Sequence, residues 1–166
     1  MRKHLPIYYH SAGYAEEYHQ TESYRASYKL NLMCRDAIRE AIETHYKNNS
    51  LDEAAAHEII EQFGYKRTMA VLANTVVNNS WDGRYSSSNK KWAQDVVLPW
   101  CMLGENNHTF TLATTHPGLV DLFLTQVRQE YDRAFGHRHS VKAALKENTV
   151  QTATEPKSRK KNEQSL

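Results

Sequence analysis

Apolar residues recur every three or four positions along most of the first 135 residues, and this spacing predicts a mainly helical chain. About five helices are expected, some of them short. The longest begins at Thr21 or Ser23 and ends at the Asn48-Asn49 pair. Its apolar face would consist of Tyr24, Tyr28, Leu32, Ile38, Ala41, Ile42 and Tyr46.

Start and stop signals bound the other helices. Ser50 is a good N-cap, and Glu53 three residues later completes a capping box. Gly64 is a natural stop for that helix, and Ser11 can cap a short helix near the N-terminus. The expected ranges are 11–18, 50–63, 65–78, 87–97 and 115–135.

Two segments have the composition of β-strands. Residues 7–9 are Ile-Tyr-Tyr, types that favour extended backbone. Residues 109–113 alternate in polarity and are rich in β-forming types. Because both segments are extended in character, we expect them to pair. The predicted fold class is therefore mainly α (α+β), with about five helices, a small two-stranded β element and a disordered C-terminal tail.

The charge of the chain is unevenly distributed. Residues 137–166 hold seven Lys or Arg against three Glu, whereas residues 1–136 carry a net charge of −2 within a total of +2. The polar 137–166 segment has no aromatic residue, so we expect a basic, disordered tail after a single globular domain of residues 1–136. A weakly charged domain argues against an acidic mimic of DNA and against the broad basic face of duplex-binding proteins.

No pattern in the chain indicates a metal, a cofactor or a membrane partner. Cys34 and Cys101 stand far apart and form no CxxC pair, so a reduced, cytoplasmic setting is expected. No stretch approaches the roughly 18 apolar residues of a membrane span. The segment from His57 to Glu61 begins like a zinc-protease helix but lacks its second histidine.

The densest group of polar and aromatic residues lies between positions 74 and 92. One interpretation is a recognition loop, whose aromatic rings stack on RNA bases while its cations contact phosphates. The alternative, favoured for the tryptophans, is a tight turn at Asp82-Gly83 with Trp81 and Trp92 packed into the core. The candidate nucleic-acid-binding residues are Trp81, Arg84, Tyr85, Asn89, Lys90 and Lys91, together with Lys157, Arg159, Lys160 and Lys161 of the tail.

His116 is the candidate for catalysis. It stands at a predicted helix N-terminus, where backbone amides favour anions such as phosphate, and a neutral imidazole there can act as general acid or base. In a ribonuclease without a metal, Asp82 would be its partner, and Arg84 and Lys91 would stabilise the phosphate. The alternative is a capping or packing histidine.

Two further patterns have a structural and a functional interpretation. Six of the ten tyrosines fall within the first 28 residues, where they form either a binding surface or a packing face for the N-terminal segment. Arg39 and Glu43 have i,i+4 spacing, which is typical of a solvated helix face.

Five stretches of the chain carry a resemblance to a known family. They read NLMCRDAI at 31–38, VLANTV at 71–76, WDGRYS at 81–86, NKKWA at 89–93 and HPGLVD at 116–121. With them the chain resembles an uncharacterised domain of conjugative elements, plasmids and phages of Gram-positive bacteria, often found with a YodL-type domain. The resemblance covers roughly residues 5–135 and supplies no catalytic residues.

The resemblance implies a biological context. Small proteins of mobile elements often protect incoming DNA from host defence, so the leading hypothesis is an anti-CRISPR protein that inhibits a Cas9-type effector through guide RNA or the effector–RNA complex. One alternative is a ribonuclease that cuts the guide RNA, ranked below binding. The other is a non-enzymatic protein-interaction module of conjugation or plasmid maintenance.

Overall fold

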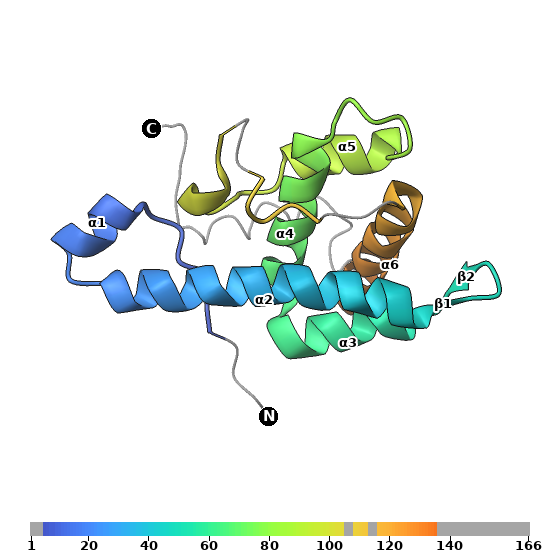
Figure 1. The fold of residues 1–166 in the computed structure, drawn as a ribbon, viewed down its shortest axis with the longest axis horizontal. Helices are drawn as coiled ribbons and strands as arrows, with labels where there is room; N and C mark the ends of the chain where they lie inside the picture. The colour runs from blue at the N-terminus through green and yellow to red at the C-terminus, as the bar shows by residue number, and fades with distance from the viewer. Residues whose placement is uncertain (1–4, 105–107, 113–115, 136–166) are drawn as a thin grey trace. The chain divides into compact units, whose positions relative to one another are not determined.

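The computed structural model describes residues 5–104, 108–112 and 116–135 (Figure 1). The described ranges are mainly helical, as predicted, with one two-stranded antiparallel sheet. The helices are α1 Ala12–Glu17, α2 Thr21–His45, α3 Ala54–Phe63, α4 Tyr65–Asn78, α5 Ser87–Gln94, the short 3₁₀ helix η1 Trp100–Met102, and α6 Pro117–Phe135. The predicted tail of residues 137–166 lies outside the described residues.

The chain divides into two compact units, one up to Val127 and one from Arg128 onward. In the second unit the described residues are the end of α6, where the rings of Tyr131 and Phe135 lie 4.8 Å apart. The predicted single domain of residues 1–136 stays a prediction.

The core of the first unit forms where the apolar faces of its helices meet. α2 packs on α3 and α4, and α4 crosses α2 and leads to α5 (Figure 1). Because α4 has neighbours on several sides, residues 70–76 are all buried. The largest fully buried apolar side chains are Phe110, Phe123, Ile38, Leu72, Met102 and Leu124. None of the helices in the described ranges has the length and apolar character that a membrane span requires.

The two-stranded element lies in a different place from the predicted one. Strand β1, Tyr46–Lys47, pairs with β2, Ser50–Leu51, so that Tyr46 faces Leu51. Asn48 and Asn49 connect them with φ angles of 54° and 63°. Two positive φ angles are typical of a tight hairpin turn, and asparagine tolerates them better than most residues. The Asn-Asn pair therefore makes a hairpin turn, whereas α2 already ends at His45.

The predicted pairing of residues 7–9 with residues 109–113 is wrong for the described residues, because their backbone groups bond to other partners. The Tyr8 N–H donates to Ser27 Oγ over 3.0 Å, and the Leu112 N–H donates to Thr75 Oγ1 over 3.1 Å. A buried backbone group needs one partner but not a ladder. Bonds to side chains of α2 and α4, together with a bond from the Trp100 N–H to the Tyr9 carbonyl over 2.9 Å, therefore replace the strand pairing.

The predicted capping box at Ser50 is also wrong. Ser50 belongs to β2, and the first amide of α3, at Ala54, donates to Asp52 Oδ1 over 3.0 Å. Other signals are confirmed, since Ser11 caps α1 and Gly64, at φ 86°, ends α3. Glycine suits that position because residues with a Cβ rarely adopt a positive φ.

Candidate functional site

The loop between α4 and α5, residues 79–86, exposes a tryptophan. Trp81 is 76% exposed, so the interpretation that it packs into the core is wrong. Trp92 is half-buried against the core, as that interpretation predicted. An exposed indole offers an apolar face to a ligand, and the recognition-loop interpretation therefore applies to Trp81 alone of the two.

Asp82 and Arg84 hold this loop in one conformation. Asp82 Oδ1 accepts from the backbone N–H of Arg84 over 2.9 Å and from its Nε over 3.0 Å, and Oδ2 accepts from Nη2 over 2.9 Å. The Asp82 N–H donates in turn to the Asn79 carbonyl over 2.9 Å. A bidentate arginine–carboxylate pair fixes the orientation of the guanidinium plane. Arg84 is thus presented to solvent in a preset orientation, in the same loop as Trp81.

The same contacts define what Asp82 can do. The hydrogen bonds from the Arg84 side chain and backbone lower the pKa of Asp82, and the paired carboxylate raises the pKa of Arg84. Asp82 is buried, whereas most of the Arg84 side chain is exposed. A carboxylate occupied by three donors anchors a cation rather than accepting a substrate proton, so its role is positioning.

The remaining loop candidates divide between surface and interior. Lys91 is exposed and Lys90 half-buried. Asn89 is buried, and its Nδ2 donates to Asp121 Oδ1 over 2.8 Å and to Thr125 Oγ1 over 3.1 Å. These bonds join α5 to α6, so the Asn89 amide is used inside the protein.

Tyr85 is also an interior residue of the loop. Burial raises its pKa to about 12, and the neighbouring carboxylates of Asp82 and Asp121 add to the shift. Within the loop and α5, the exposed candidates are therefore Trp81, Arg84 and Lys91. The tail candidates Lys157, Arg159, Lys160 and Lys161 lie outside the described residues.

His116 does not meet Asp82 in the site that the sequence predicted. It lines a pocket of about 190 Å³ between the C-terminal part of α2 and the start of α6. The apolar part of the lining consists of Ile42, Leu112, Leu119 and Val120. The polar lining consists of Arg39, Glu43, Tyr46 and His116. The structure thus places His116 with residues of α2 and β1, while Asp82 bonds to Arg84.

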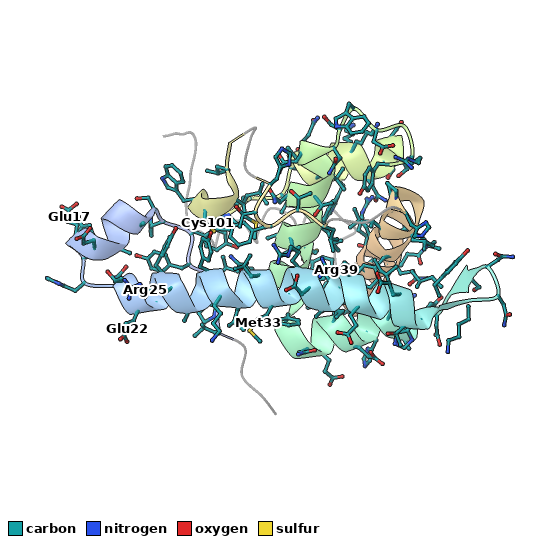
Figure 2. All side chains as sticks on the ribbon, viewed as in Figure 1. Glu17, Glu22, Arg25, Met33, Arg39 and Cys101 are labelled. Atoms are coloured by element: carbon teal, nitrogen blue, oxygen red, sulfur yellow. The ribbon has the colours of Figure 1, made fainter. Side chains whose placement is uncertain are left out.

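The polar lining differs from the solvated ion pair expected of Arg39 and Glu43. Arg39 Nη2 instead lies 3.4 Å from Asp36 Oδ1, and Glu43 has no hydrogen-bond or ion-pair partner among the residues that the structure describes. Figure 2 shows Arg39 on α2, and the pocket lining places it with Leu119 and Val120 of the first turn of α6. A carboxylate, a cation and an imidazole thus line the same pocket.

Sequence reasoning missed Arg39, Glu43 and Tyr46 as members of one site. The spacing of four residues between Arg39 and Glu43 was the available signal, because it places them on one face of α2 beside buried Ile38 and Ile42. Tyr46 follows three residues later, just past the end of α2. What no local pattern supplies is the position of α6, which brings His116 to that face.

A second polar cluster is fully internal. Arg67 is 2% exposed and donates from Nε to Asn31 Oδ1 over 2.7 Å, from Nη2 to Ser27 Oγ over 2.9 Å and from Nη1 to the Leu5 carbonyl over 2.8 Å. Burial lowers its pKa. Since neutral oxygens occupy its donors, Arg67 fastens the N-terminal segment to α2 and α4.

The cysteines show no sign of nucleophilic activation. Burial raises the pKa of Cys34 to about 12, and it also raises the pKa of Cys101, which lies at η1 (Figure 2). A nucleophilic cysteine needs a lowered pKa. In the described ranges, no group of three or more His, Cys, Asp or Glu side chains could hold a metal ion.

These features define a small helical protein with an exposed aromatic and cationic loop and a pocket with acid–base groups. The chain belongs to the family described as protein of unknown function (DUF3849), which matches residues 7–132. That range contains both the loop and the pocket. No curated protein and no solved structure matches the chain.

Proposed function

We propose that this protein binds single-stranded RNA through the loop between α4 and α5. The observation that carries the proposal is the 76% exposure of Trp81 in the same loop as an arginine that Asp82 holds in place. An exposed aromatic ring stacks on any base, and each such stack contributes about 1–3 kcal/mol. Arg84 and Lys91 supply the cations that contact the neighbouring phosphates.

The proposed target is the guide RNA of a Cas9-type effector, free or in the effector–RNA complex. This part rests on the resemblance to domains of mobile elements, whose small proteins often protect incoming DNA. The net charge of −2 on residues 1–136 is too small for a protein that imitates DNA. A counter-defence protein that acts on RNA fits both the charge and the loop.

The test compares two exposed tryptophans. Trp81→Ala should weaken binding of a labelled single-stranded guide RNA about ten- to hundredfold, because one base loses its stacking partner. Trp100→Ala is the matched control, since Trp100 is 54% exposed but lies in η1, away from the loop sequence. Fluorescence anisotropy measures both affinities. Equal affinity of Trp81→Ala and wild type would refute the loop as the RNA site.

A second arm tests the effector. Purified Cas9 loaded with guide RNA is mixed with this protein and scored for cleavage of target DNA. Lost DNA cleavage that Trp81→Ala restores supports inhibition through RNA. Unchanged DNA cleavage would refute the proposed inhibition of that effector. RNA binding would still be decided by the anisotropy measurement.

A protein-interaction module of conjugation or plasmid maintenance is the second candidate function. The observation in its favour is a group of surface rings, in which Tyr14 and Tyr18 lie 4.5 Å apart and Tyr18 is 53% exposed. Trp100 lines a neighbouring pocket with Tyr24 and Tyr28. On this alternative, Tyr18→Ala reduces plasmid transfer while RNA affinity stays at the wild-type value.

A further inference from the structure

The pocket at His116 gathers the groups that RNA cleavage needs. Arg39 and Glu43 belong to α2, Tyr46 belongs to β1, and His116 lies immediately before α6. We propose that this pocket is a metal-independent phosphodiester-cleaving site for single-stranded RNA, an inference that rests on the proposed RNA binding. The site has a different composition from the one that the sequence predicted, since Glu43 and Arg39 take the places of Asp82 and Arg84.

The size of the pocket limits what it can hold. Pockets for drug-sized ligands enclose about 300–1,000 Å³, whereas this pocket encloses about 190 Å³. It therefore accommodates one group of a larger ligand whose remainder stays outside. One phosphate with its ribose, within a longer strand, meets that condition, and the apolar lining residues Ile42 and Val120 would lie against the sugar.

The polar lining has the charges that the reaction requires. Glu43 has no partner among the described residues, so its carboxylate is available as a base. His116 immediately precedes α6, lines the same pocket and can serve as the acid. Arg39, together with the positive end of the α6 dipole, stabilises the negative charge that develops on the phosphate.

The step balances without a metal or a co-reactant. The ribose 2′-oxygen bonds to phosphorus as its proton passes to Glu43, and the bond from phosphorus to O5′ breaks as His116 gives its proton to O5′. The products are a 2′,3′-cyclic phosphate and a free 5′-hydroxyl. Exchange with solvent then removes the proton from Glu43 and returns one to His116.

α6 connects this pocket to the RNA-binding loop. Its Asp121 accepts from the Ser86 N–H over 2.9 Å and from Asn89, and it follows His116 by five residues. Five helical residues rise about 7–8 Å. Asp121 thus joins the loop that carries Trp81 to the helix whose first turn lines the pocket.

The test measures binding and cleavage of one RNA in the same samples, with EDTA present. Wild-type protein should release fragments that end in a 2′,3′-cyclic phosphate and should leave a 2′-deoxy version of the RNA intact. Glu43→Gln and His116→Ala should each slow cleavage at least about a hundredfold, the effect of removing a general acid or base. Both should keep wild-type RNA affinity and helical circular dichroism.

Two matched variants control for charge and surface position. Glu40→Gln changes an exposed acid of α2 that does not line the pocket, and His57→Ala changes an exposed histidine of α3. Both should cleave at the wild-type rate.

Different outcomes overturn different proposals. Normal binding with intact RNA, or cleavage that neither Glu43→Gln nor His116→Ala reduces, overturns the cleavage site and leaves RNA binding standing. Cleavage that survives Trp81→Ala unchanged overturns the loop as the RNA site and leaves the pocket standing. An RNA that wild-type protein neither binds nor cuts overturns both.

Discussion

Two arginines show how neighbouring groups decide the role of one residue type. Arg84 lies at the surface with Asp82 beside it, so it stays charged, oriented and open to a ligand. Arg67 is buried, and its N–H groups donate to neutral oxygens of Asn31, Ser27 and Leu5 inside the protein. Burial and partner chemistry, rather than residue type, separate a binding group from a structural one.

Cys34 provides a prediction at the residue scale. Its pKa of about 12 in the folded protein exceeds the ordinary 9.0, because burial disfavours the thiolate. The unfolded chain therefore releases this proton first, and the stability that the neutral thiol contributes is present below about pH 9 and lost as pH rises toward about 12. Tyr85 acts in the same direction from its ordinary value of 10.0.

Urea denaturation at a series of alkaline pH values measures this effect. The free energy of unfolding of wild type should decline between about pH 9 and 12, and Cys34→Ala should decline less steeply. Cys101→Ala is the comparison: Cys101 is only partly buried, so this substitution should flatten the decline less than Cys34→Ala does. Parallel curves for wild type and Cys34→Ala would contradict the account.

At the scale of elements, side chains rather than strand pairing fasten the N-terminal segment. Arg67 of α4 binds the carbonyls of Leu5 and Pro6, while Ser27 of α2 accepts from Tyr8. The extended segment therefore depends on two helices at once. Losing one side chain removes several bonds together.

Arg67→Met should lower the free energy of unfolding by about 2–4 kcal/mol. The substitution leaves Asn31 Oδ1 and the Leu5 carbonyl without their donor, and each buried polar group left unpaired costs about 1–3 kcal/mol. Arg25→Met, at an exposed position of α2, should change stability by less than about 0.5 kcal/mol (Figure 2). Urea denaturation measures both. A loss below 1 kcal/mol for Arg67→Met would show that water replaces the lost bonds.

The helices were predictable because their signals are local. The sequence shows the helical spacing of apolar residues such as Ile38 and Ile42, which are buried. It also shows the stop of α3 at Gly64. The strands were misplaced because Tyr8 and Tyr9 bond to Ser27 and Trp100, which no local pattern connects to them. The same limit hid the pocket, since only the packing of α6 brings His116 to Glu43.

At the scale of the whole molecule, charge limits how RNA is bound. Residues 1–136 carry a net charge of −2, and the positive excess belongs to residues 137–166. Affinity for RNA should therefore come from stacking and a few phosphate contacts rather than from a general positive field. Each phosphate contact on a single strand contributes about −0.7 to the slope of log affinity against log salt.

Salt dependence separates the loop from the tail. With Lys157, Arg159, Lys160 and Lys161 all changed to Gln, the slope for RNA should be about −1.4, the value for two contacts by Arg84 and Lys91. Wild type should be steeper, up to about −4 if all four tail cations participate. Anisotropy titrations at several salt concentrations measure both. A slope near zero in the tail variant would mean that the loop cations do not contact phosphate.

The bonds from Arg67 also bear on the order in which the chain assembles. They join residues 62 and 61 positions apart, whereas α2, α3 and α4 follow one another closely in sequence. Closing a long loop costs more entropy than forming neighbouring contacts. We therefore expect the helices to form first. The segment around Leu5 and Pro6 then packs against the assembled helices. It is also the part whose amide protons should exchange earliest while the helices remain closed.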